Sequence, residues 1–181
     1  MKQRLLPYLL LGFVVCLGTA IFFPLPNRSP HNARRSSCQS NLKQIGLAWL
    51  QYAQDHDERL PPGHWATAIS PYLRGAKPDD VFYCPETPYT SGTSDYFWNR
   101  RFSGKQQILI SRPETLILLG DGQDNAPLDA TLGSLPKTWR RDENSPAWRH
   151  LGTANYAFAD GHVKSLKANW VTSYLRMGAA K

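Results

Sequence analysis

The stretch SCQSNLKQIGLAWLQYAQDHDERLPP, Ser37 to Pro62, decides the fold. Its apolar residues recur at alternating spacings of four and three: Cys38, Leu42, Ile45, Trp49 and Tyr52. This spacing places one apolar stripe along one side of a helix. Serines at its start are typical helix caps, and Pro61-Pro62 end it. Because the stripe must be buried, the sequence predicts a helix that packs against the rest of a domain.

Beyond this helix, the chain changes to strand-like patterns. The β-rich runs are VFYCP (81–85), DYFWN (95–99), QQILI (106–110) and TLILLGD (115–121), and HWATAISPYL (64–73) before them has helical spacing. The sharpest signal is NYAFADGHVKSL (155–166), two alternating arms around Asp160-Gly161, which predicts a hairpin. The region from Asp121 to Arg141 is rich in turn residues and is interpreted as a loop. Together these patterns predict an α+β fold, with the helix packed on an antiparallel β-sheet.

A hydrophobic segment precedes the helix. Leu5 to Phe23 contains 19 residues without a charge, and a helix of that length spans about 28 Å, close to the hydrocarbon thickness of a bilayer. Lys2 and Arg4 flank its start closely, which favours a cytoplasmic N-terminus and an extracytoplasmic domain in a single-pass membrane protein. The expected organisation is a transmembrane anchor in contact with membrane lipid at 1–26, a linker or helix continuation at 27–37, and one extracytoplasmic domain at 38–181.

A cleaved signal peptide is the alternative for this segment. Gly18-Thr19-Ala20 has the small residues that signal peptidases prefer. The apolar run nevertheless continues through Phe23 and is longer than a usual signal-peptide core, which favours the uncleaved anchor.

The charge of the chain limits the expected binding partners, and its cysteines raise the question of a disulfide. The chain has a formal charge of +7 but no run of five or six like charges, so we expect a solvated basic surface and no nucleic-acid partner. Cys16 lies in the apolar segment, and Cys38 and Cys84 lie in the expected domain. Two such cysteines outside the cytosol can form a disulfide, closing a loop of about 45 residues and adding roughly 4 kcal/mol. The alternative is two buried free thiols, and the bridge is favoured.

Three segments together match a known family: the apolar N-terminus running into ARRSSCQSNLKQIGLAWLQYAQDHDERLPP, the middle FYCPE, and RHLGTANYAFADGHVKSL. In the third segment, nine residues separate His150 from Asp160-Gly161. The chain resembles the prepilin-type proteins with a C-terminal His-x9-Asp-Gly motif, which are related to the G-type pseudopilins of type II secretion. The resemblance implies a pilin-like fold, whose long N-terminal helix has a membrane half and an amphipathic half packed on the sheet. It also implies assembly with like subunits, or with secretion or pilus assembly proteins.

The N-terminus departs from the prepilin pattern. Prepilins have a short basic leader before a Gly-Phe cleavage point, whereas Gly12-Phe13 lies inside the apolar run. Leu17 stands where prepilins have a glutamate that offers its carboxylate to the terminal amine of a neighbouring subunit. These differences favour a derived relative that kept the domain and replaced the leader with a plain anchor.

The motif residues are interpreted first as structural. Asp160-Gly161 suits the turn of the hairpin, with Gly161 at positive φ, and His150 suits a hydrogen-bonding residue in the preceding loop. The alternative is a metal or substrate site formed by His150, Asp160 and His162.

One acidic segment raises the question of calcium. GDGQDNAPLD contains Asp121, Asp124 and Asp129, and some pseudopilins bind calcium in a C-terminal loop. The spacing differs from that of an EF-hand loop, so solvation of a loop is the favoured interpretation and no cofactor is expected apart from this calcium alternative.

The sequence lacks a nucleophile elbow, a P-loop, a dinucleotide fingerprint, an HExxH motif and a CxxC pair, so we expect no enzyme activity. The expected function is that of a membrane-anchored, pilin-like structural protein of the cell envelope, linked to type II secretion or pilus-type assembly. The alternatives are an anchored extracytoplasmic binding module and a metal-dependent hydrolase that uses His150, Asp160 and His162.

Overall fold

The computed structural model describes residues 12–15, 18, 29–73, 75 and 78–171. The predicted anchor at 1–26 lies almost wholly outside these residues, although residues 12–15 are helical. Within the described part of the chain, no helix combines the length and the apolar character needed to cross a bilayer. The anchor therefore stays a prediction.

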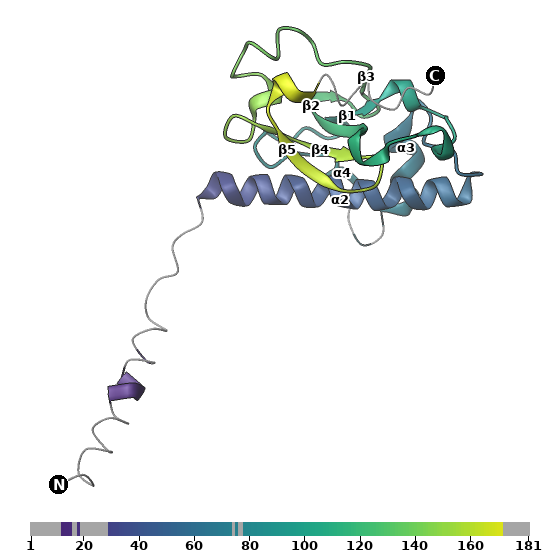
Figure 1. Ribbon diagram of the computed structural model, residues 1–181. Coiled ribbons are helices and arrows are strands. Elements are labelled where there is room, and N and C mark those ends of the chain that lie inside the picture. Colours follow the sequence, from purple (N-terminus) through teal and green to yellow (C-terminus); the bar gives the residue numbers. More distant parts are fainter. Residues whose placement is uncertain (1–11, 16–17, 19–28, 74, 76–77, 172–181) are drawn as a thin grey trace, which may run out of the picture.

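Helix α2 (Pro30–Asp55) lies along the sheet for most of the length of the domain (Figure 1). Its predicted apolar stripe is confirmed, because Cys38, Leu42, Ile45 and Trp49 are all fully buried. The predicted serine caps are wrong. The hydroxyls of Ser36 and Ser37 donate to backbone carbonyls one turn back, so both serines lie inside the helix. The helix begins instead at Pro30, where the missing N–H of proline leaves no helical bond unmade.

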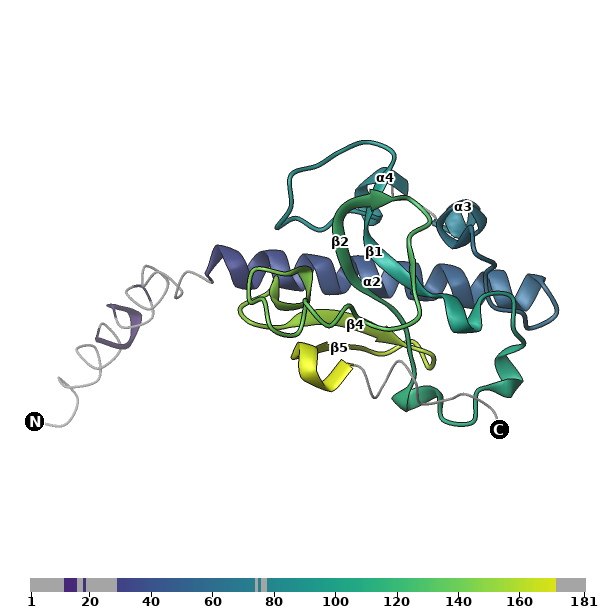
Figure 2. The ribbon, with the colours of Figure 1, turned by 90° about the horizontal axis from the view of Figure 1, so that it is seen from above.

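In the described part of the chain, five strands form one mixed sheet in the order β3-β1-β2-β4-β5. Figure 2 labels β1, β2, β4 and β5 of this sheet. Their bounds are β1 (Thr93–Asn99), β2 (Ile117–Pro127), β3 (Thr131–Leu132), β4 (Ala154–Phe158) and β5 (Val163–Leu166). The predicted α+β class is confirmed, but the sheet is not purely antiparallel, since β3 runs parallel to β1. The end of β2 lies beside the start of β1, at the pair Thr93 and Pro127. From there the chain crosses to the edge of β1 that faces away from β2. It then runs as β3 in the same direction as β1.

The shorter helices connect these elements. They are α3 (Trp65–Ile69), α4 (Pro78–Val81) and the 3-10 helices η2 (Ser70–Tyr72), η3 (Arg100–Phe102), η4 (Gln107–Leu109), η5 (Pro113–Thr115) and η6 (Pro146–Trp148). The helix predicted at 64–73 is confirmed as α3 followed by η2. The runs DYFWN and TLILLGD are confirmed as parts of β1 and β2, and the predicted hairpin as β4 and β5.

Three predicted segments differ from the structure. QQILI contains η4 instead of a strand, because the N–H of Gln107 bonds the carbonyl of Glu58 at 2.8 Å and ties the segment to the chain after α2. VFYCP begins with Val81, the last residue of α4, and forms no strand. The predicted loop from Asp121 begins with the second half of β2, since Ala126 and Pro127 pair with the start of β1.

Both faces of the sheet are covered. On the α2 face, Trp49, Trp65 and Trp98 pack together, with Trp98 6.3 Å from Trp49 and 6.1 Å from Trp65 between ring centroids. On the other face, Phe97 packs against Tyr156. Neighbouring residues of β1 thus enter different clusters, as the alternation of a strand requires, and the middle of the sheet is buried on both sides.

Gly120 in β2 offers a test of this packing. A Cβ at Gly120 would lie 2.7 Å from Cε1 of Tyr156, a fully buried ring that must then move. We expect Gly120→Ala to lower the free energy of unfolding by about 1–3 kcal/mol, the usual cost of overpacking. Gly63→Ala is the matched control, because a Cβ there has no atom within 4 Å. Urea unfolding of both variants measures the difference, and equal stabilities would contradict the close approach.

Candidate functional site: buried cysteine, aspartate and histidine side chains

Four polar side chains meet in the interior of the domain, and we call them the buried cluster: Cys38, Cys84, Asp121 and His150. They come from α2, the loop after α4, β2 and the turn after η6. Each is at most 1% exposed, and their sulfur, oxygen and nitrogen atoms all lie within 4.8 Å of one another. Polar side chains this deeply buried need partners, so the contacts inside the cluster decide its chemistry.

Cys84 is positioned by a second buried carboxylate. The N–H of Cys84 donates to Oδ2 of Asp95 at 2.8 Å, and the hydroxyl of Thr87 donates to the same oxygen. The other oxygen of Asp95 accepts from the N–H of Asn125 at 2.8 Å. These bonds join the loop that carries Cys84 to β1 and β2.

His150 is held by the turn that follows it. Its backbone N–H donates to the carbonyl of Thr153 at 2.8 Å, while the Thr153 hydroxyl donates back to the His150 carbonyl at 2.7 Å. Leu151 and Gly152 both have positive φ, which the tight turn requires. The turn holds the backbone of His150, and its side chain is buried in the domain.

Asp121 links the other members of the cluster. One carboxylate oxygen accepts from the Cys38 thiol at 3.1 Å, and the other accepts from the N–H of Asn155 at 2.6 Å. Nε2 of His150 lies 3.3 Å from this second oxygen. The guanidinium of Arg149, only 6% exposed, lies 3.7 Å from Asp121 and compensates its buried charge.

The same contacts shift the pKa values of the cluster. The neighbouring side chains of Cys38 and His150 together outweigh burial and lower the pKa of Cys84 to about 6. Burial opposes protonation of His150, but hydrogen bonds with Asp121 and Cys84 raise its pKa to about 9. Burial raises the pKa of Cys38 well above its usual value. These shifts favour the ionised form of Cys84 and the protonated form of His150.

The cluster resembles a catalytic triad in composition but not in geometry. A triad histidine contacts its nucleophile through one ring nitrogen and its carboxylate through the other. Here Nε2 of His150 faces both Cys84, at 3.4 Å, and Asp121, at 3.3 Å, while Nδ1 has no hydrogen-bond partner among the described residues. Both thiols are also fully buried. This arrangement suits holding a structural group better than attacking a substrate.

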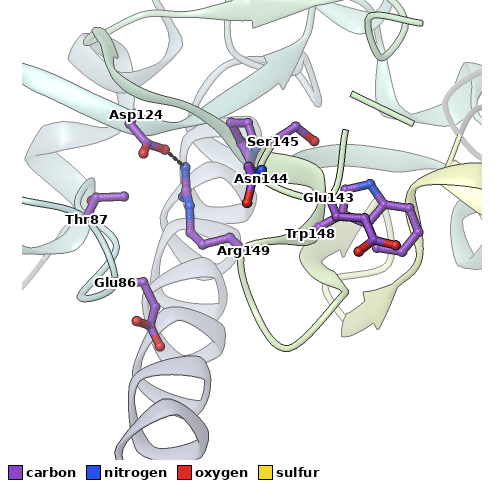
Figure 3. A pocket seen from close by; sticks show the side chains of 9 residues that line it. Glu86, Thr87, Asp124, Glu143, Asn144, Ser145, Trp148 and Arg149 are labelled. Carbon is purple, nitrogen blue, oxygen red and sulfur yellow. Dashed lines mark hydrogen bonds and ion pairs between the residues drawn. The ribbon is translucent and has the colours of Figure 1, made fainter. Parts of the chain in front are cut away.

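A polar pocket of about 230 Å³ adjoins the cluster (Figure 3). Arg149 lines it and pairs there with Asp124, as the dashed line in Figure 3 marks. Glu86 and Glu143 also line the pocket, so its wall is acidic overall. Since Arg149 contacts Asp121 as well, one side chain joins the pocket to the buried cluster.

The His-x9-Asp-Gly residues do not come together. His150 belongs to the buried cluster, whereas Asp160 lies at the β4–β5 turn and accepts from the ring of His162 at 2.6 Å. Gly161 has a φ of 88°, as the turn interpretation requires. In the described residues, the group of possible metal ligands that includes His150 contains neither Asp160 nor His162, so the alternative site is not formed there.

The two predicted disulfide partners are neighbours in the buried cluster. Both are free thiols in this structure, with their sulfur atoms within 4.8 Å. A disulfide needs an S–S distance of about 2.05 Å. The Cys38–Cys84 bridge therefore stays a prediction.

The acidic segment considered for calcium sends its carboxylates in three directions. Asp121 points into the buried cluster, and Asp124 pairs with Arg149. Asp129 accepts from the N–H groups of Ala66 and Thr67 at 2.7 and 3.1 Å, at the start of α3. The three residues do not surround a common point, so they offer no shared calcium site.

Sequence reasoning missed the roles of Asp121 and Arg149. Asp121 stands at the boundary of two predicted segments, because it ends the strand-like run TLILLGD and begins the region interpreted as a loop. A charged residue at the end of such a run was the available signal. Arg149 precedes the motif histidine, but its position in sequence gives no sign of its partners.

Comparison with known proteins adds one match. A family model described as "Protein of unknown function (DUF1559)", SBP_bac_10, matches residues 31–78. The matched part covers α2 from its second residue, together with α3 and η2. It includes Cys38 but ends before the other three members of the buried cluster. No curated protein and no solved structure matches the chain.

Proposed function

We propose that this chain is a membrane-anchored, pilin-like structural protein of the cell envelope, with a cytoplasmic N-terminus and an extracytoplasmic domain. The observation that carries the proposal is the course of α2. This helix lies lengthwise against the sheet, and in the sequence six residues separate its start from the end of the 19-residue uncharged segment Leu5 to Phe23. A helix placed in this way joins the domain to the predicted anchor through one short link.

Polar contacts support a fixed position of α2 on the domain. Gln39 donates to Oδ1 of Asn155 at 3.2 Å and to the hydroxyl of Ser165 at 3.0 Å, which joins the helix to β4 and β5. Asn41 donates to the carbonyl of Tyr83 at 2.9 Å on the other side. These partly buried bonds suit a helix that carries a domain at a constant orientation to its anchor.

The described part of the N-terminal segment supports contact with lipid. Phe13 and Val14 are each 63% exposed, and Val15 is 55% exposed. Consecutive large apolar side chains that the domain leaves uncovered need another apolar environment. Membrane lipid is the proposed partner, and like subunits or secretion or pilus assembly proteins are proposed on the resemblance of the three sequence segments.

Membrane fractionation of the full-length chain tests the anchor. We expect the protein to sediment with membranes and to resist alkaline extraction, and its domain to be cleaved by protease added from the outer side. Replacing both Val14 and Val15 with Arg should release much of the protein, because each arginine in a membrane span costs about 2.5–3.5 kcal/mol.

Ile108→Arg is the matched control for this experiment. Ile108 is 84% exposed on the domain surface, so a charge there should leave the fractionation unchanged. Recovery of the intact wild-type chain in the soluble fraction would contradict the proposal.

A further inference from the structure

The buried cluster has the ligand types of a zinc site. Cys38 and Cys84 offer sulfur, and Asp121 and His150 offer a carboxylate oxygen and an imidazole nitrogen. Zn²⁺ binds these three atom types, and its structural sites have four protein ligands in a closed tetrahedron. Mg²⁺ and Ca²⁺ prefer sites made of oxygen alone, so the two sulfurs argue against them.

The distances suit that tetrahedron. Zn–S bonds of about 2.3 Å and Zn–N or Zn–O bonds of about 2.0–2.2 Å place neighbouring ligand atoms roughly 3.3–3.8 Å apart. Nε2 of His150 lies 3.4 Å from Sγ of Cys84 and 3.3 Å from Oδ2 of Asp121, and Sγ of Cys38 lies 3.1 Å from the other oxygen of Asp121, Oδ1. No pair of the four ligand atoms is more than 4.8 Å apart, so shifts of about 1 Å complete the site.

The surrounding charge also suits a divalent cation. Metal-bound cysteine and aspartate are ionised, so the three anionic ligands carry three negative charges. The two positive charges of Zn²⁺ compensate two of them, and one negative charge remains. The guanidinium of Arg149, 3.7 Å from Asp121, neutralises the remainder. The ion, its four ligands and this guanidinium then carry no net charge among themselves, which lowers the cost of burying them. Arg149 also pairs with Asp124, and the carboxylate of Asp95 accepts from the backbone of Cys84.

Neighbouring groups hold the ligands in place. Asp121 accepts from the backbone of Asn155, and the hydroxyl of Tyr96 lies 3.2 Å from Sγ of Cys38. Such outer hydrogen bonds orient metal ligands.

We propose that Cys38, Cys84, Asp121 and His150 bind one structural Zn²⁺ ion. The ion joins α2, the loop before β1, strand β2 and the turn before β4. A disulfide uses only two of these four side chains, whereas the convergence of the carboxylate and the imidazole on the sulfurs is what a tetrahedral metal requires. The two arrangements exclude each other, so the experiment must distinguish them.

Metal analysis of the full-length chain, purified in detergent with a reductant and without chelators, provides the test. We expect about one zinc ion per chain by mass spectrometry of the metal content. After zinc is removed, added Co²⁺ should give the visible bands of tetrahedral cobalt and a thiolate-to-cobalt charge-transfer band in the near ultraviolet. Chelation should lower the melting temperature, and zinc should restore it.

Two variants assign the ligands. Cys84→Ser should lower the zinc affinity by at least about tenfold. Loss of a group that only hydrogen-bonds a metal ligand already costs about tenfold or more, and Cys84 is proposed as a ligand itself. Cys16→Ser, the third cysteine, should bind zinc like the wild type. If Cys84→Ser does not fold, the cobalt spectrum of the wild type decides alone.

Two results overturn the proposal. One is a reduced, folded wild-type chain that binds neither zinc nor cobalt. The other is a chain that contains a Cys38–Cys84 disulfide and no metal when its thiols are blocked at cell lysis. Neither result depends on whether the N-terminal segment anchors the chain, so failure of this proposal and failure of the proposed function are separate outcomes.

Discussion

Replacing Arg149 with methionine should lower the free energy of unfolding by about 3–5 kcal/mol, the usual cost of removing one partner from a buried ion pair. Methionine keeps most of the side-chain volume, so the loss reports the charge and its hydrogen bonds. The variant removes the guanidinium near Asp121 and the bond to the Gly122 carbonyl at 2.7 Å. Chemical unfolding with a chelator and a reductant present excludes a contribution from bound metal.

Arg112→Met is the control for this measurement. Arg112 is 66% exposed on its side chain and faces Glu114 at 4.0 Å, so its loss should cost at most about 1 kcal/mol. Adding Asp121→Asn to Arg149→Met should recover part of the loss, because the buried charge is removed together with its partner. If Arg149→Met and Arg112→Met are equally stable, Arg149 does not compensate a buried carboxylate.

Trp49→Ala should destabilise the domain by a similar amount, about 3–5 kcal/mol, the range measured for large aromatic residues in cores. Trp49 is fully buried on α2, and its ring packs edge-on against that of Trp98. Alanine leaves a cavity between the helix and the sheet. Thermal or urea unfolding of the full-length chain measures the effect.

Leu47→Ala on the same helix is its matched control. Leu47 lies two residues away, is 61% exposed, and should change the stability by no more than about 0.5 kcal/mol. A cost below about 1 kcal/mol for Trp49→Ala would mean that the apolar stripe of α2 does not form the core that its spacing predicts.

Local sequence patterns predicted two kinds of element: those whose pairing partner is close in sequence, and those whose apolar residues recur at a regular spacing. The stripe from Cys38 to Trp49 and the alternation around Asp160-Gly161 each follow from the geometry of one element. The start of α2 was less predictable, because Ser36 and Ser37 suit a cap as well as they suit a bond to the preceding turn. The strand predicted for QQILI was wrong because of a tertiary contact, since its backbone bonds the segment after α2 instead of a neighbouring strand.

The buried cluster was only partly predictable. The sequence suggested that Cys38 and Cys84 meet, and that His150 has a structural role. It could not place Asp121 between them, because these contacts depend on the order of strands in the sheet. Strand order is set by packing across the whole domain, and a single sequence contains no direct record of it.

The positions of the four cluster residues along the chain have a consequence for biosynthesis. Cys38 and Cys84 leave the ribosome well before Asp121 and His150, which complete their enclosure. In the growing polypeptide both thiols are therefore accessible to oxidants, to metal ions and to chaperones.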